Sequence, residues 1–528
     1  MEDDTSFEEN NLDDFIIKDK DYKKRKMKQR IKFFFIILLI LMIITIIIII
    51  IIKVKNITYG KITCIYQTFQ ENETIELINN PEEKMEFFLL INEEKFDQKN
   101  KHTFKNPGLY KITFMLKKRL TSLSKLFANK TALIEIDFSE LESQEITSLN
   151  NLFSNCINLK KVKFGFDESE KIEDMSFLFN NCFSLESVIF NFNTNNVNNL
   201  ESMFENCHSI TYIDLSYFNL EKVKRMSNTF SGCHNLLEIK FPKSFTNELI
   251  FMGEIFKDCI NLENIDLSFL RTEKVEGFTN IFEGCEKLQE IDLSHLKTSK
   301  VRYISNMFLN CKSLKKIDLS NLDFENLLSF DSLFEGCSNL TFINISSLNV
   351  PKVHDMKATF KDCINLKSII FPSNLSGINS FSSTFENCIS LESIDLSVFN
   401  GIENLMNVNN MFANCTSLKQ IEFPTIKASG LKSTSNMFFG CSKLEYIDMG
   451  NFLTSSDLKN LDNMFYNCSS LTFLNISQLY TGNLQNVYNI FHGVNKPIRL
   501  IIYEDVDEFL KQEISKLTII NETEFELF

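Results

Sequence analysis

One pattern of apolar and polar positions repeats along most of this chain. In Leu288–Ser294, leucine and isoleucine alternate with polar residues, which predicts a short strand with one buried face. Apolar residues then recur ten, seven, four and three positions before Cys311, a spacing that predicts one or two helical turns against the core. Directly before the cysteine stands Asn, Gly or Asp, residues that tolerate a positive φ. Each unit is therefore predicted to contain a strand, a loop, a short helix and a left-handed turn.

Cysteines mark the period of this repeat. Thirteen of them lie 25, 26 or 27 residues apart, and Phe stands three positions before each one. The phase extends outward to Phe127 and Phe491, where Lys130 and Val494 replace the cysteine, so these units are predicted to be the degenerate ends of an array. The repeat cysteines are Cys156, Cys182, Cys207, Cys233, Cys259, Cys285, Cys311, Cys337, Cys363, Cys388, Cys415, Cys441 and Cys468. Stacking such units predicts an α/β solenoid with a parallel β-sheet along one face.

The unit resembles the BspA-like leucine-rich repeats of surface proteins in bacteria and parasitic protists. Their pattern Met-Phe-x-x-Cys-x-x-Leu-x-x-Ile-Asp-Leu-Ser is present nearly whole in Met307–Ser320. The resemblance covers roughly residues 120–495 and implies a leucine-rich-repeat array with a cell-surface role, often adhesion to host molecules. It implies no particular ligand.

A membrane segment precedes the repeats. Phe33–Ile52 is a run of twenty residues in which Thr45 is the only polar side chain, and as a helix it would span roughly 30 Å, the thickness of the hydrocarbon core. A cleaved signal peptide is the alternative. Its apolar region should be shorter and end in a small-x-small site, whereas this one runs into Lys53. The segment is therefore interpreted as a transmembrane helix.

The charges that flank this segment predict its orientation. Seven of the ten residues directly before it are basic and only Lys53, Lys55 and Lys61 follow nearby, so the positive-inside rule retains the N-terminal side in the cytoplasm. The seven are Lys23, Lys24, Arg25, Lys26, Lys28, Arg30 and Lys32. The prediction is a single-pass type II protein of the plasma membrane with its C-terminal solenoid outside the cell.

The chain is accordingly predicted to have five parts. These are a cytoplasmic tail, acidic then basic (1–32), the transmembrane helix (33–52), a membrane-proximal β-rich capping subdomain (53–120), the solenoid (121–495) and a C-terminal cap (496–528).

The two flanking pieces carry their own element signals. Candidate strands lie around Ile62–Phe69, Met85–Ile91 and Leu109–Leu116. After the last repeat, Ile498–Tyr503 is interpreted as a final strand and Asp505–Leu517 as a short helix that covers the open end of the core.

The cysteine column could hold metal ions, form disulfides or consist of buried free thiols. Metal sites usually contain close pairs such as C-x-x-C, and the column contains none. Disulfides between coils would need Cβ atoms ~3.5–4.5 Å apart, whereas equivalent atoms of neighbouring coils should stay ~4.8 Å apart. The thiols are therefore expected to be free and buried as small apolar residues, and Cys64, outside the array, to be a buried strand residue. The Phe column is expected to form the core.

A column of aspartates is the candidate ligand-binding site. It occupies the outward position of the predicted sheet, where stacked like charges repel unless neighbouring serines or a bound cation stabilise them. Hydrogen bonding to serine, or simple solvation, is one interpretation and a Ca²⁺ or basic-ligand site is the other. The residues are Asp214, Asp266, Asp292, Asp318, Asp395 and Asp448.

Other chemistry is weakly signalled. His208 and His234 follow the cysteines of adjacent coils and could stack, but two histidines make a poor metal site. No nucleophile elbow, P-loop or H-E-x-x-H motif is present, so no catalytic, cofactor or metal site is predicted and the protein is not expected to be an enzyme. A net charge of −14 argues against nucleic-acid binding. Among ten N-x-S/T sequons, the glycosylation candidates are Asn72, Asn129, Asn374 and Asn521.

The functional hypothesis is a surface protein that binds extracellular or host protein ligands and serves in adhesion. The alternative is a non-adhesive receptor subunit or a structural coat protein that signals only through partners.

Overall fold

The computed structural model divides the chain into two compact units, Met1–Tyr59 and Gly60–Phe528. The residues it describes are 6–55, 58–79, 85–166, 171–373, 375–503 and 506–520.

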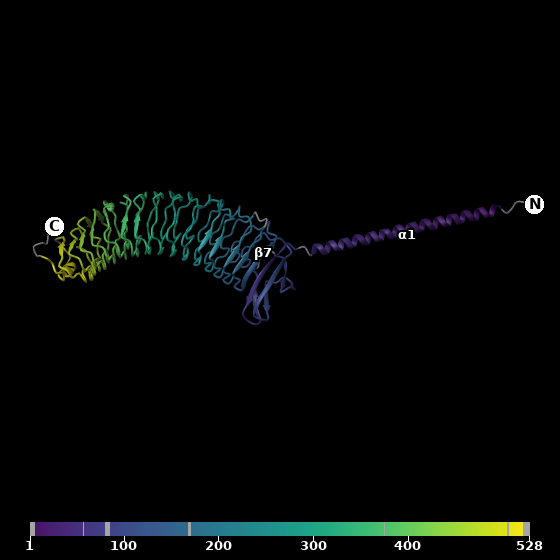
Figure 1. Ribbon diagram of the computed structural model, residues 1–528, viewed down its shortest axis with the longest axis horizontal. Coiled ribbons are helices and arrows are strands. Elements are labelled where there is room, and N and C mark those ends of the chain that lie inside the picture. The colour runs from purple at the N-terminus through teal and green to yellow at the C-terminus, as the bar shows by residue number, and fades with distance from the viewer. Residues whose placement is uncertain are drawn as a thin grey trace, which may run out of the picture. The chain divides into compact units, whose positions relative to one another are not determined.

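The N-terminal unit is a single helix, α1 (Ser6–Lys55), drawn in Figure 1. It contains the predicted apolar segment, and Asp19–Ile50 is long and apolar enough to cross a membrane. The hydroxyl of Thr45 donates to the carbonyl of Met42 at 2.8 Å, so the polar side chain in the apolar run is satisfied inside the helix.

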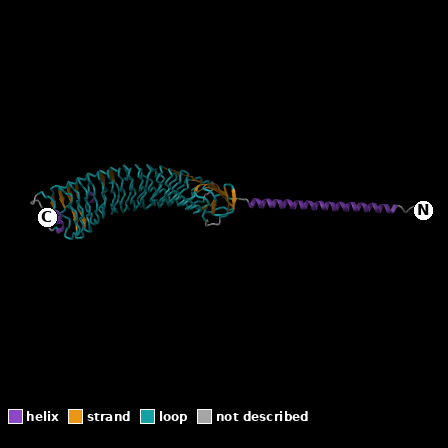
Figure 2. Cartoon of the chain, turned by 90° about the horizontal axis from the view of Figure 1, so that it is seen from below, coloured by secondary structure: helices purple, strands orange, loops and turns teal. Residues whose placement is uncertain are grey.

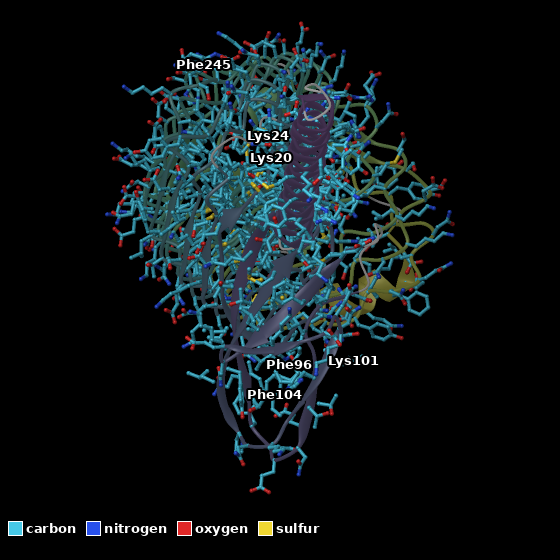
Figure 3. The ribbon with its side chains drawn as sticks, turned by 90° about the vertical axis from the view of Figure 1, so that its right-hand side faces the viewer. Lys20, Lys24, Phe96, Lys101, Phe104 and Phe245 are labelled. Carbon is cyan, nitrogen blue, oxygen red and sulfur yellow. The ribbon has the colours of Figure 1, made fainter. Side chains whose placement is uncertain are left out.

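The second unit begins with a β-rich piece. Its strands are β1 (Gly60–Thr68), β2 (Glu73–Glu76), β3 (Phe87–Ile91), β4 (Glu94–Phe96), β5 (Lys101–Phe104) and β6 (Gly108–Leu116). The three predicted strands are confirmed as β1, β3 and β6, while the short strands β2, β4 and β5 were not predicted. Phe96 and Phe104 lie close together here (Figure 3), and the His102 ring between them is 5.1 Å from the first and 4.5 Å from the second.

The sheet of this piece continues into the repeats. Strand β1 pairs antiparallel with β6 and with β7 (Leu133–Leu141), and β7 then pairs parallel with β8 (Lys161–Lys163). At the same junction, the buried ammonium of Lys130 donates to Glu76 at 3.1 Å and to the side chain of Asn79. Lys130 occupies the cysteine position of the first coil. The predicted degenerate first unit is therefore hydrogen-bonded to the β-rich piece through this residue.

The repeats form a parallel β-solenoid of about 14 coils (Figures 1 and 2). Short strands pair in register, so that Ile213 lies opposite Ile239. These strands are β9 (Ser187–Ile189), β10 (Tyr212–Asp214), β11 (Glu238–Lys240), β12 (Phe342–Asn344), β13 (Ser368–Ile370), β14 (Gln420–Glu422), β16 (Tyr446–Asp448), β18 (Phe473–Asn475) and β19 (Arg499–Ile501). A separate pair is formed by β15 (Ile426–Ala428) and β17 (Phe452–Thr454), and one short 3₁₀ turn, η1, spans Ser397–Phe399. The predicted leucine-rich-repeat solenoid with a parallel sheet is confirmed.

The predicted short helix in each unit is wrong. The left-handed residue before the cysteine is present, for example Asn310 with φ of 60°, but a second one stands four positions earlier, Asn306 with φ of 57°. A right-handed helix cannot include such residues. The backbone N–H groups of Asn306 and Phe308 instead donate to carbonyls of the following coil, those of Asp331 and Leu333, at 3.1 and 3.0 Å. Hydrogen bonds that a helix would form internally therefore join neighbouring coils.

The Phe column forms the core, as expected. Successive rings from Phe127 to Phe491 stack with centroids 5.2–6.0 Å apart. All of these rings are buried. Burial of each ring contributes on the order of 1.5–3 kcal/mol, so the column is a large part of the stabilisation of the array.

The cysteines are free and buried, which confirms that prediction for the repeats and for Cys64. Each repeat thiol donates to the carbonyl oxygen of the Phe in the preceding coil, with Sγ–O distances of 3.0–3.3 Å. Burial raises the pKa of these thiols, to about 12 for Cys156, Cys233 and Cys441. The thiols are therefore protonated hydrogen-bond donors at neutral pH.

The last coil is closed by β19 and by α2 (Glu508–Ile514). The Asp507 carboxylate accepts the N–H of Phe509 at 2.8 Å, which caps the helix, and Leu510 and Ile514 are buried. The predicted final strand and short helix are confirmed.

We expect Gly336→Ala to lower the free energy of unfolding by about 1–2 kcal/mol. Gly336 has φ of 74°, and an added Cβ would collide with the side chain of Asn310. Gly253→Ala is the matched control, because Gly253 lies outside the left-handed region and its nearest atom is 3.4 Å from an added Cβ. Denaturant unfolding of the two variants measures the difference; equal losses would contradict the assigned role of the left-handed position.

We also expect none of the 14 thiols to react with a maleimide in the native protein, because all are buried and protonated. All should react once the chain is unfolded in denaturant. Intact-mass measurement after alkylation provides the readout. Fast labelling of several repeat cysteines under native conditions, or masses that indicate disulfides, would show that the ladder of thiol hydrogen bonds is not present.

Candidate functional site

The sheet face is built from the three-residue strand of each coil. The middle residue points into the core, as with Ile343, while the flanking Phe342 and Asn344 are exposed. This alternation follows from the period of two in a strand. Because equivalent residues stack coil upon coil, the outward positions form two columns on the same face.

The predicted aspartates lie in one of these columns. Each carboxylate accepts the backbone N–H of the residue two positions later, at 2.8–2.9 Å. The pairs are Asp214 with Ser216, Asp266 with Ser268, Asp292 with Ser294, Asp318 with Ser320, Asp395 with Ser397 and Asp448 with Gly450. Each aspartate thus closes the turn that follows its strand, the bonding to serine that one of the two interpretations expected.

These hydrogen bonds change the acidity of the column. Hydrogen bonds from the backbone of Ser268 and then its side chain lower the pKa of Asp266 below its ordinary value. Hydrogen bonds from the side chain and backbone of the following serine likewise lower the pKa of Asp292 and of Asp318. The pKa values of Asp214 and Asp395 are lowered in the same way. The carboxylates are therefore ionised even in mild acid.

Three of the six aspartates are brought together, since Asp266, Asp292 and Asp318 occupy consecutive coils. The last two line a depression of about 580 Å³ with Glu290 and Lys316, which pair with each other at 3.4 Å. Asp214 instead faces Lys240 of the next coil at 3.9 Å. Within the part of the chain that the structure describes, no group of three or more His, Cys, Asp or Glu side chains is arranged to hold a metal ion.

A larger depression on the same face was not predicted. It has a volume of about 840 Å³, a floor that includes Phe164, Phe190 and Phe192, and exposed lining residues Ile189 and Tyr217. Tyr217 is 84% exposed. The equivalent position carries a polar residue in several other coils, such as His295, Asn321 and Ser347, and an apolar one in Phe269 and Val398, so the signal in the sequence is weak. The lining also includes Lys163, Asn191 and Asn193, and a hollow of this volume is within the range of ligand-binding sites.

Further aromatic residues project from the first outward column. Tyr212 and Phe342 are about half-exposed, and Tyr446 stacks on Phe473 with centroids 4.4 Å apart. The Arg499 guanidinium lies 6.0 Å from the Phe473 ring. Aromatic and arginine side chains are the residues most often found at the centres of protein interfaces. The sequence search missed them because it followed the aspartate column.

The remaining predicted positions are dispersed. Asn72, in the turn between β1 and β2, and Asn129 are both exposed and both have a positive φ. The carboxamide oxygen of Asn129 also accepts a hydrogen bond from Asn155 at 3.0 Å. Asn374 and Asn521 lie outside the described residues. His208 and His234 stack, as was considered, with ring centroids 4.4 Å apart.

Two protein-family models match the repeat region. Residues 121–239 and 238–342 match the family described as "Mycoplasma protein of unknown function, DUF285". Residues 330–472 and 383–495 match the "BspA type Leucine rich repeat region (6 copies)". Neither description is that of an enzyme. No curated protein matches the chain.

Solved leucine-rich-repeat structures are similar to parts of it. A leucine-rich cell surface protein of Faecalibacterium prausnitzii is 17% identical over 53% of this chain and 83% of its own, with a TM-score of 0.31. A leucine-rich-repeat protein of Eubacterium ventriosum is 14% identical over 64% of this chain and 83% of its own, with a TM-score of 0.33. The T. pallidum leucine-rich-repeat protein is 14% identical over 54% and 83%, with a TM-score of 0.17.

We expect the triple variant Asp266→Asn, Asp292→Asn, Asp318→Asn to resist acid better than the wild type. Asn344 caps Ser346 at 3.0 Å in the same column, so asparagine preserves the turn. Folding lowers the three aspartate pKa values, so the carboxylates stabilise the fold above the unfolded pKa of about 3.9, and this contribution is lost as the pH falls through the folded values. Melting temperatures should agree at neutral pH and separate below about pH 4. Parallel curves would contradict the assignment.

Proposed function

This chain is a BspA-like leucine-rich-repeat protein, and from that premise we propose that it is a cell-surface binding protein whose solenoid attaches the cell to host or other extracellular proteins. Solenoids offer an extended face of stacked columns to large partners. The observation that carries the proposal is the aromatic-floored depression beside Ile189 and Tyr217. Contiguous patches of exposed apolar side chains commonly mark interaction sites on protein surfaces.

The proposed ligand contacts follow from the chemistry of the face. Apolar side chains of the ligand lie in the depression against its aromatic floor, and Tyr212 and Tyr217 extend the apolar contact along neighbouring coils. The aspartate column would add polar contacts, with Asp292 and Asp318 accepting hydrogen bonds from basic groups of the ligand in the second depression. Asp214, Asp266, Asp395 and Asp448 lie in the same column and would serve longer ligands.

The proposed topology is single-pass type II in the plasma membrane. The basic run of residues 23–32 remains in the cytoplasm, the apolar part of α1 crosses the bilayer, and everything after Lys53 lies outside. The five parts keep the limits 1–32, 33–52, 53–120, 121–495 and 496–528. On the outer side, the exposed turn at Asn72 is the favoured candidate for glycosylation.

Two epitope tags test the display of the solenoid. In intact cells that express the full-length chain, antibody should reach a C-terminal tag but not an N-terminal tag, because the basic flank holds the N-terminus inside. Staining of the C-terminal tag only after permeabilisation would overturn the outward orientation and with it the adhesion proposal.

Attachment of the same cells to host cells tests the binding surface. Ile189→Ser with Tyr217→Ser should reduce attachment on the order of tenfold, since central apolar anchors carry most of the binding energy of an interface. Tyr488→Ser is the matched control, because Tyr488 is 70% exposed and lies outside the depression. Unchanged attachment of the double variant, with normal surface display, would favour a receptor subunit or a coat protein.

A further inference from the structure

In most coils, a third column of the array caps the turn that follows it. Its residues stand eight positions before each repeat cysteine and before Val494, and ten of the fourteen are Ser, Asp or Asn. Nine of these accept the backbone N–H of the residue two positions later, at 2.8–3.5 Å. Backbone bridges also link the column from coil to coil. The column therefore has a structural role in most coils, and any departure from it gives up a hydrogen bond.

Four consecutive coils depart from this pattern. They carry Arg225, Phe251, Gly277 and Tyr303, none of which has an acceptor to cap the turn. The backbone path is retained, since Arg225 bridges to Phe251 and Gly277 bridges to Tyr303. Both aromatic side chains are 47% exposed. Local rules that are broken without a gain in packing are expected at functional sites.

Gly277 places no side chain between Phe251 and Tyr303 in this column. Gly277 lies outside the left-handed region, and an added Cβ would meet its nearest atoms at 3.6 Å, an ordinary contact, so the backbone does not require glycine here. Phe251 and Tyr303 are two coils apart, which is ~10 Å at the spacing of neighbouring strands. Since apolar contacts form at ~3.5–4.0 Å on each side, this gap has room for one flat ring or branched aliphatic group.

Positive charge surrounds the gap. The Arg225 guanidinium lies 4.6 Å from the Phe251 ring centroid and also bonds Glu201 at 2.7 Å, while the Arg302 guanidinium lies 5.6 Å from the Tyr303 ring. Over these four coils, the capping column and the column before it hold three cations, Lys224, Arg225 and Arg302. Two carboxylates lie against them, Glu276 and the Glu201 group that pairs with Arg225, so one positive charge is in excess. The chain as a whole carries a net charge of −14. The local excess of positive charge thus complements an acidic partner, not a basic one.

We propose that Arg225, Phe251, Gly277, Arg302 and Tyr303, hereafter the aromatic notch, form a docking site for an acidic protein segment that inserts one aromatic or branched apolar side chain. The inserted side chain contacts the two rings and the flanking carboxylates of the segment meet the arginines. The aromatic notch lies in a different column from the sheet face, so it is a second surface that does not depend on the proposed sheet-face ligand.

A peptide of sequence Gly-Asp-Glu-Phe-Glu-Asp-Gly, labelled with a fluorophore, is the probe. Fluorescence polarisation with the full-length protein in phosphatidylcholine nanodiscs should show saturable binding. Replacement of the phenylalanine by alanine, or of the four acidic residues by lysine, should weaken binding on the order of tenfold or more, because the first removes the inserted side chain and the second reverses the charge. Equal binding of the three peptides, or no saturable binding below about 1 mM, would overturn the proposal.

Variants that restore the capping residue distinguish an effect on peptide binding from an effect on the stability of the fold. Phe251→Ser with Tyr303→Ser introduces the residue that caps other coils, so the melting temperature should not fall while peptide binding drops on the order of tenfold or more. Gly277→Asn should have the same effect on binding because it fills the gap.

Phe342→Ser and Tyr488→Ser are the matched controls, with exposures of 46% and 70% at positions outside the aromatic notch. They should leave peptide binding unchanged. Full binding by the Phe251→Ser, Tyr303→Ser variant, or an equal loss in the controls, would show that the aromatic notch is not the site. Because these variants do not touch the depression at Tyr217, failure of this proposal and failure of the sheet-face proposal are distinguishable.

Discussion

The structure of the array depends on the direction of its backbone hydrogen bonds. Two left-handed residues in every coil, such as Asn306 and Asn310, prevent the intervening segment from closing into a helix. The N–H groups of this segment therefore bond to carbonyls of the next coil. The short strands of neighbouring coils are also hydrogen-bonded to each other. With backbone bonds between coils at several positions, each coil can be short and almost free of regular secondary structure and still be held in register.

This close stacking explains the composition of the interior. At two positions the close stacking admits one flat ring and one small side chain, and Phe and Cys recur there in thirteen coils, beside buried Leu, Ile, Val and Met side chains. Cysteine suits its position because the thiol is small and apolar enough to be buried, yet donates to the Phe carbonyl of the preceding coil. At the first coil, where no earlier repeat exists, Lys130 takes that position and bonds Glu76 and Asn79 of the β-rich piece. The cysteine position of the repeat thus links neighbouring coils to each other, and in the first coil it links the solenoid to the β-rich piece.

Because the interior is nearly the same in every coil, residues with a specific function are expected in the outward columns. Most outward residues are accounted for by the turn they close, as the aspartates of the sheet face and the serines and asparagines of the capping column are. The informative residues are those that depart from their column. Tyr217 stands at a position that is polar in several other coils, and Phe251 and Tyr303 stand where an acceptor is expected. In a repeat protein the other coils serve as an internal reference, so such departures can be recognised within a single chain.

The sequence by itself determined the repeat, its period, the inward Phe and Cys columns, the free thiols, the left-handed residue before each cysteine and the apolar N-terminal helix. These are properties of spacing and residue type, and those of the repeat recur from unit to unit. Only the tertiary structure decided that the segment before the cysteine is a set of turns, because the second left-handed position is filled by residues as different as Phe177, Ala358 and Asn489. It also decided which outward side chains gather around a depression and which aspartates lie together. The exposure of an outward side chain and its distance from side chains of other coils depend on the direction that each turn gives to it. These quantities are defined only once the coils have stacked.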